Sequence, residues 1–188
     1  MLLRGIVIRK TEAGEHNKII TVYTRELGKI KLMAKSAKKS TSKQAGHLDL
    51  LNLVDFVAVP GKSYQIITQT QSSENFLGIK SSYAKLMAGF FVLESFHRLI
   101  YEEERDPALW NFLNAQLNKL EEIKVEPLAD QGSTLIPGFL ADFKKELINV
   151  LGYKHNLEKE EADYFLQSLS RQKFSSLHLL NMNNGELL

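Results

Sequence analysis

The sequence lacks cysteine altogether and contains only 4 prolines and 1 tryptophan in 188 residues. The absence of cysteine excludes disulfide bonds, thiolate nucleophiles, Cys-X-X-Cys redox pairs and cysteine-ligated zinc. No run of about 18 uncharged apolar residues occurs, so we expect no membrane-spanning helix. The first residues lack the charged start and the apolar core of a secretory signal, so we expect a cytoplasmic protein.

Motifs for covalent chemistry are also missing. The chain has no GxSxG nucleophile elbow and neither of the phosphate-binding patterns GxxxxGK[ST] and GxGxxG. Its 5 histidines are scattered singly, without a second histidine or a carboxylate at a ligand spacing. We therefore predict no catalytic residue, no metal site and no cofactor, and we expect that the protein is not an enzyme.

The charge is divided unevenly along the chain. Residues 1–75 carry 12 Lys and Arg against 6 Asp and Glu, a net charge of +6, whereas residues 76–188 carry 12 against 16, a net charge of −4. Seven of the basic side chains fall within residues 25–43, against Glu26 as the one acidic side chain. This asymmetry favours a polyanionic partner for the first part of the chain. A solvated lysine-rich surface remains the alternative.

Short runs rich in β-branched and aromatic residues fill the first 75 residues, and they predict five strands joined by turns. The runs cover residues 6–8, 19–24, 28–33, 51–59 and 64–70. Within the third run, Ile30 and Leu32 alternate with Lys29 and Lys31, so the apolar side faces the core and the basic side faces solvent. Five short strands in about 75 residues predict a small barrel of the OB type.

After residue 75 the apolar residues recur at helical spacing, which predicts an all-α domain. Helices are expected at about 83–100, from Asp106-Pro107 onwards, at 139–151 and at 160–169, with a loop over 125–138. The fold class is therefore β + α, with a five-stranded OB-type domain at 1–75 and a helical bundle at 76–188. The run Glu102–Glu104 is unfavourable at a helix C-terminus, which hints at a partner or at an earlier helix end.

OB-type barrels bind oligonucleotides on the face built from strands 2 and 3, and basic side chains there neutralise phosphates. Tyr23 can either stack on a base or lie in the core, and strand parity leaves both roles open. The candidate nucleic-acid-binding residues on this face and in the following loop are Tyr23, Arg25, Lys29, Lys31, Lys35, Lys38, Lys39 and Lys43.

Several short segments follow one another in a particular order along the chain. They are a Gly-Glu-x-Asn-Lys-Ile turn at 14–19, a Thr-x-x-Thr strand at 21–24, Gly-Lys at 28–29, Ala-Lys-x-Ala-Lys at 34–38, and Leu-Gly-Tyr at 151–153. As a set they resemble the RecO family of bacterial recombination mediators. The chain departs from the family at Ser36, where a glycine is usual, and after Tyr153, where a cysteine zinc finger often follows. It therefore resembles a divergent member whose last subdomain is shortened or held together by apolar packing.

The resemblance implies DNA repair in the cytoplasm, at the nucleoid. It implies binding of single- and double-stranded DNA, annealing of complementary strands, and RecA loading onto strands covered by single-stranded DNA-binding protein, usually with RecR. It also implies an apolar groove on the helical half for the tail of the single-stranded DNA-binding protein. Arg98 is a candidate carboxylate clamp beside such a groove. An ordinary salt bridge to Glu94 or Glu102 is the alternative for this arginine.

Two other functions remain open. An OB protein associated with RNA or the ribosome would use the same basic face, and a dependence on the 2′-hydroxyl would distinguish it. A small hydrolase could use scattered carboxylates such as Glu15, Asp49 and Glu74, although no two of them share an obvious site.

Overall fold

The computed structural model describes residues 2–38, 42, 44–124, 135–153, 159–170 and 174–176. The chain forms two compact units. The first unit contains Met1–Asn75 and Ile100–Trp110, and the second contains Phe76–Leu99 and Asn111–Leu188. The first boundary coincides with the change of sequence pattern after residue 75. The stretch Ile100–Trp110, which the pattern assigns to the helical domain, belongs to the first unit.

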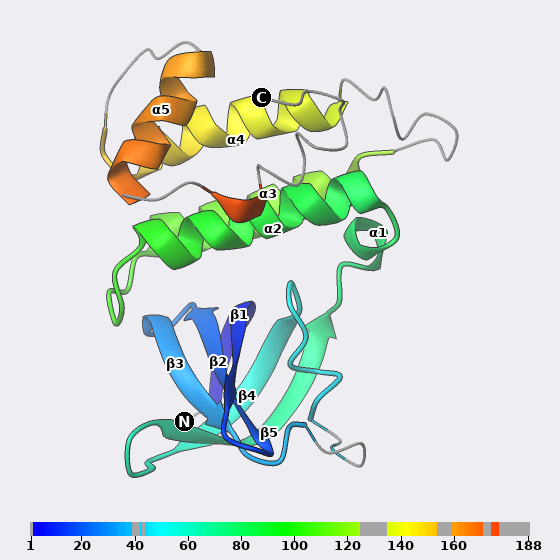
Figure 1. Ribbon diagram of the computed structural model, residues 1–188, viewed down its shortest axis with the longest axis vertical. Coiled ribbons are helices and arrows are strands. Elements are labelled where there is room, and N and C mark those ends of the chain that lie inside the picture. The colour runs from blue at the N-terminus through cyan, green and yellow to red at the C-terminus, as the bar shows by residue number, and fades with distance from the viewer. Residues whose placement is uncertain are drawn as a thin grey trace. The chain divides into compact units, whose positions relative to one another are not determined.

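The first unit is a five-stranded barrel of the OB type, which confirms the predicted fold class (Figure 1). Its strands are β1 (Leu2–Ala13), β2 (Asn17–Thr24), β3 (Gly28–Ala34), β4 (Leu53–Val59) and β5 (Gln65–Glu74). They close in the order β1-β2-β3-β5-β4, with antiparallel pairing throughout except for the short parallel pairing of β3 with β5. Each of the five predicted runs overlaps one of these strands, and the runs at 51–59 and 64–70 begin one or two residues before β4 and β5.

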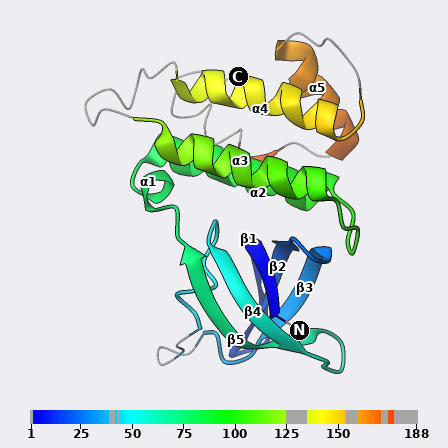
Figure 2. The ribbon, with the colours of Figure 1, turned by 180° about the vertical axis from the view of Figure 1, so that it is seen from behind.

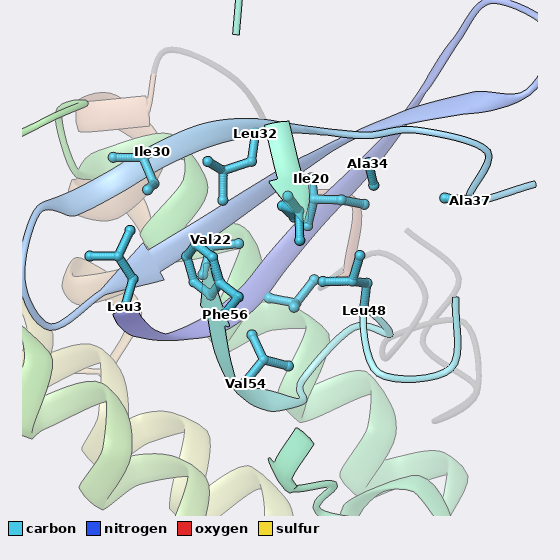
Figure 3. Packing of buried hydrophobic residues seen from close by; sticks show 12 residues of the cluster. Leu3, Ile20, Val22, Ile30, Leu32, Ala34, Ala37, Leu48, Val54 and Phe56 are labelled. Atoms are coloured by element: carbon cyan, nitrogen blue, oxygen red, sulfur yellow. The ribbon is translucent and has the colours of Figure 1, made fainter. Parts of the chain in front are cut away.

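Alternating apolar side chains from the strands fill the barrel. Figure 3 shows Ile30 and Leu32 of β3 among these side chains, as the alternation in the third run predicts. Phe56 of β4 is the largest side chain of the cluster and is 1% exposed. Burying an aliphatic or aromatic side chain of this size contributes about 1.5–3 kcal/mol, so this interior is a main source of the unit's stability.

The segment Ile100–Trp110 completes the barrel unit. β5 pairs with β3 at Leu32 and Met33, towards the end of β3, and nearer its start Lys29 pairs in a parallel bridge with Glu102. The N–H of Glu103 donates to the carbonyl oxygen of Lys29 at 2.9 Å. The acidic run therefore lies outside any helix and along β3, which agrees with the earlier helix end that the sequence hinted at.

The second unit is helical, as predicted. Its helices are α1 (Leu77–Lys80), α2 (Tyr83–Leu99), α4 (Leu135–Val150) and α5 (Lys159–Ser170), together with most of α3 (Pro107–Glu122). In Figures 1 and 2, α2 and α3 run side by side and α5 lies across the end of α4. Phe143 of α4 stacks on Phe112 of α3 at 5.6 Å between ring centroids and meets Phe91 of α2 edge-on at 5.8 Å, so aromatic packing joins three helices.

The helix ends follow local chemistry. Asp106 caps α3 as predicted, because its Oδ1 accepts the N–H groups of Ala108 and Leu109 at 2.7 and 3.2 Å. Gly152 has a φ of 87° just after α4, the left-handed conformation in which a glycine commonly ends a helix. The predicted loop is wrong over residues 135–138, which form the first turn of α4. A proline is tolerated in that turn, because its missing N–H would have no partner within the helix.

A substitution at Gly28 tests whether the acidic run lies where the structure places it. Gly28 has a φ of 70°, and a Cβ atom there would lie 2.0 Å from the carbonyl oxygen of Glu104. We expect Gly28→Ala to lower the free energy of unfolding by about 2 kcal/mol or more, because the alanine is strained and must push the segment away. Urea unfolding of the full chain measures this change.

Gly46→Ala is the matched control, because a Cβ atom there meets nothing within 4 Å. We expect this control to change stability by less than about 1 kcal/mol. Equal effects of the two substitutions would contradict the close approach of Glu104 to Gly28.

Candidate nucleic-acid interface

The outer face of β2 and β3 carries the residues that were expected to meet nucleic acid. Tyr23 lies opposite Lys29, and Thr21 lies opposite Lys31, so these four side chains share one side of the sheet. Tyr23 and Lys29 are only 0% and 5% exposed. Thr21 is also buried, at 2% exposed, so of these four side chains only that of Lys31 reaches solvent. The parity of the strands is therefore as predicted, but the expected solvent exposure of the basic side is wrong for Lys29.

Lys29 is a structural residue in this arrangement. Its Nζ donates to the carbonyl oxygen of Ile100. Burial lowers the pKa of Lys29, the nearby charge of Lys31 lowers it further, and Glu102 opposes both effects. A phosphate would have to displace the segment to reach this ammonium group. The prediction that Lys29 faces solvent is therefore corrected.

The sequence left two roles open for Tyr23, stacking on a base or packing in the core, and the structure places it in the core. Its ring stacks on Trp110, with 6.5 Å between centroids and 23° between planes. Burial, and then the charges of Asp106 and Glu104, raise the pKa of Tyr23. A ring with no exposed surface cannot stack on a base, so Tyr23 is not part of the interface proposed below.

Lys31 remains accessible. Its Nζ lies 2.5 Å from a carboxylate oxygen of Glu102, and the two side chains are 38% and 48% exposed. Ion pairs at such exposure contribute about 0–1 kcal/mol, because solvent and salt screen them. A phosphate can therefore compete with Glu102 for Lys31.

The loop after β3 is tied to the turn between β1 and β2. The N–H of Ser36 donates to Oδ1 of Asn17 at 3.0 Å, and the N–H of Lys38 donates to the carbonyl oxygen of His16 at 3.1 Å. Ser36 has a φ of 56°, in the left-handed region that glycine adopts freely. The two turns thus present Lys35 and Lys38 from a fixed backbone at one end of the barrel.

Lys18 lies on β2 beside these two turns, and its charge acts on Glu12, the carboxylate that pairs with Lys38. We call Lys18, Lys35 and Lys38 the loop-end cluster. Lys35 is exposed, and it has no carboxylate partner among the residues that the structure describes. Lys38 donates to the carbonyl oxygen of Gly14 at 3.0 Å and pairs with Glu12 at 2.9 Å. The hydrogen bond from Lys38, then its charge and that of Lys18, lower the pKa of Glu12.

Sequence reasoning missed Lys18. It lies within the Gly-Glu-x-Asn-Lys-Ile turn and pairs across the sheet with Ala34, the residue before Lys35. That register could have been derived from the short Arg25–Gly28 hairpin turn by counting back along both strands.

The other predicted cations are not part of the loop-end cluster. Arg25 lies in the β2–β3 turn, where its Nε is 2.9 Å from Glu26. The length of β3 places this turn about 20 Å from Lys35, at the other end of the strand. Lys39 and Lys43 fall outside the described residues. The loop-end cluster is therefore the part of the predicted surface that the structure brings together.

Arg98 lies in the helical unit and pairs with Glu94 at 2.7 Å, with side-chain exposures of 19% and 16%. This is the ordinary salt bridge that the sequence offered as the alternative to a clamp. The Arg98 guanidinium also lies over the ring of Phe174, 5.5 Å from its centroid. Glu94 accepts the N–H groups of Ser175 and Ser176, each at 3.0 Å. These contacts bind Phe174–Ser176 to α2.

The carboxylates that could have served a hydrolase are not brought together. Asp49 pairs with Lys10, while Glu15 lies in the β1–β2 turn and Glu74 ends β5. Within the described ranges, no group of three or more His, Asp or Glu side chains could hold a metal ion. None of the helices in the described part of the chain is long and apolar enough to cross a membrane.

Comparison with known proteins shows which proteins this chain is similar to. Residues 1–76 match the family model described as Recombination protein O N terminal. Proteins called DNA repair protein RecO match more of the chain. The one from Dehalococcoides mccartyi strain 195 is 31% identical over 83% of this chain and 58% of its own. The one from Thermoanaerobacter sp. strain X514 is 25% identical over 87% and 65%. The chain thus spans about three-fifths of the length of these relatives.

Glu94 predicts a pH dependence of stability. Partial burial raises its pKa, but the hydrogen bonds from Ser176 and Ser175 and the charge of Arg98 outweigh this effect, and the pKa lies below its usual 4.5. The contribution of Glu94 to stability is therefore present above pH 4.5 and is lost as the pH falls through the folded-state pKa. We expect Glu94→Gln to lower the free energy of unfolding by about 1–3 kcal/mol at neutral pH. At about pH 3 the loss should be smaller.

Urea unfolding of the full chain at the two pH values measures this difference. Glu122→Gln, at an exposed position of α3, is the control and should have little effect at either pH. A loss from Glu94→Gln that is the same at both pH values would contradict a contribution from the charge of Glu94.

Proposed function

Because this chain belongs to the RecO family of DNA repair proteins, we propose that its barrel binds single- and double-stranded DNA through phosphates and not through bases. The observation that carries this proposal is the loop-end cluster, which an OB-type barrel holds on two tethered turns. Lysines that neutralise phosphates release condensed counterions, and this supplies affinity without regard to sequence.

The pairing of Lys38 with one of the chain's own carboxylates is compatible with such binding. Lys38 pairs with Glu12, whose side chain is 80% exposed. Exposed pairs are weak, so a phosphate can replace the carboxylate at little cost. A lysine is also a flexible point charge that can follow a changing backbone, unlike an arginine fork that reads one geometry.

Annealing is the activity that this chemistry supports best. A cationic surface that screens two phosphate backbones at once, and leaves the base edges free, lowers the repulsion between complementary strands. The proposed reaction breaks no covalent bond, so we propose a binding protein without catalytic residues or cofactor. By analogy with the family, we also propose that the protein acts at the nucleoid together with RecR. There it would assist RecA on strands covered by single-stranded DNA-binding protein.

The helical unit is the proposed site for the tail of the single-stranded DNA-binding protein. Within that unit Arg98 already pairs with Glu94 and lies over the ring of Phe174. A tail carboxylate would have to displace Glu94 to use this guanidinium. We therefore propose binding of the tail to the helical unit without assigning its carboxylate to Arg98.

The test of DNA binding is its salt dependence. With about four to six phosphate contacts, the slope of log affinity against log salt for a labelled oligo(dT) should be about −3 to −4. Lys35→Gln with Lys38→Gln should flatten this slope by about 1.4 and weaken binding alike for all sequences, because about two contacts are lost. Annealing of complementary labelled oligonucleotides, without metal or nucleotide, should slow in parallel.

Lys62→Gln with Lys124→Gln is the control, since both lysines are exposed and outside the loop-end cluster and the net charge changes equally. Equal weakening by the two pairs would reduce the proposal to a general charge effect. If structured RNA competed better than single-stranded DNA, and 2′-deoxy substitution abolished that preference, the protein would be an RNA reader instead.

A further inference from the structure

The acidic segment Glu102–Glu104 belongs to the barrel unit, although it follows α2 in the chain. Glu102 forms a parallel bridge with Lys29, and the N–H of Glu103 donates to the Lys29 carbonyl oxygen. Three successive carboxylates therefore lie along the strand whose lysines were expected to bind nucleic acid.

The backbone of the acidic segment is held by buried contacts. The carbonyl of Glu104 approaches Gly28 so closely that no side chain fits between them. On one side of the segment the Lys29 ammonium donates to Ile100, and on the other side Trp110 stacks on Tyr23. Exchange of an exposed ion pair would not release a backbone that is anchored in this way.

The side chains of the acidic segment, in contrast, are all exposed. Glu102 pairs with Lys31, and Glu103 and Glu104 carry two further negative charges in the two residues that follow Glu102. Because consecutive Cα atoms are about 3.8 Å apart, the backbones of Glu103 and Glu104 lie within about 8 Å of that of Glu102. This is inside the Debye length of about 10 Å at 0.1 M salt, so their repulsion of a phosphate near Glu102 is only partly screened.

We propose that the acidic segment is a built-in competitor for nucleic acid, which neutralises Lys31, repels phosphates from the outer face of β3 and confines the bound strand to the loop-end cluster. This inference rests on the proposed function and adds a boundary to the proposed DNA-binding surface. The segment acts like a polyanion that is already bound, and it limits both the affinity and the number of phosphates engaged.

The first test removes two charges without removing an observed contact. Glu103→Gln with Glu104→Gln should tighten the binding of labelled oligo(dT) by the full chain about three- to tenfold at low salt, because repulsion is lost. The gain should shrink as salt is added. Glu122→Gln with Asp142→Asn, two exposed carboxylates of the helical unit, gives the same change in net charge as a control.

The outcomes separate the inference from the proposed function. If the unmodified chain binds no oligo(dT) at low salt, the proposed function and the inference both fail. If it binds, but the Glu103 and Glu104 pair gains no more than the control pair, DNA binding stands and the competitor role is overturned.

The second test follows Lys31 itself. Glu102→Gln should free Lys31 to contact a phosphate, which steepens the salt slope by about 0.7, the increment for one contact with a single strand. Adding Lys31→Gln to that variant should return the slope to its original value. A slope that Glu102→Gln leaves unchanged would overturn the neutralisation of Lys31.

Discussion

The structure of the barrel unit depends on the docking of Ile100–Trp110 against the outer face of β2 and β3. A buried ammonium group needs a polar partner, and Lys29 finds it in the Ile100 carbonyl oxygen. Tyr23, in the same row of the sheet, finds its cover in Trp110. A segment that lies 25 residues beyond the last strand therefore completes the domain, and the surface left for a ligand is defined by what this segment covers.

The cationic surface is consequently smaller than the charge of the sequence indicates. Residues 1–75 carry a net charge of +6, yet Arg25, Lys31 and Lys38 each have a carboxylate of the same unit beside them. Such pairs contribute little to stability where they are exposed, and they lower the gain from binding a phosphate. Contacts of this kind suit the annealing proposed above, because salt and competing charges reverse them easily.

The sequence predicted the parts of the fold that depend on local patterns. The alternation of Ile30 and Leu32 with lysines placed β3 correctly, and Asp106-Pro107 marked the start of α3, because these signals act within a few residues. The burial of Lys29 could not be predicted in this way. Alternation tells which side of a strand a residue occupies, and it does not tell whether a segment some 70 residues away covers that side. The separation of Arg25 from Lys35 is also a matter of register, which composition does not contain.

Lysine reactivity is the most direct test of the account. The full chain would be acetylated with and without excess oligo(dT), and the modification of each lysine would be followed by mass spectrometry. We expect oligo(dT) to protect Lys35 and Lys38 and to leave Lys62 unprotected, with Lys29 unreactive in both conditions because it is buried. Protection of Lys62 without protection of Lys35, or ready acetylation of Lys29 in the free protein, would contradict a loop-end surface bounded by a docked acidic segment.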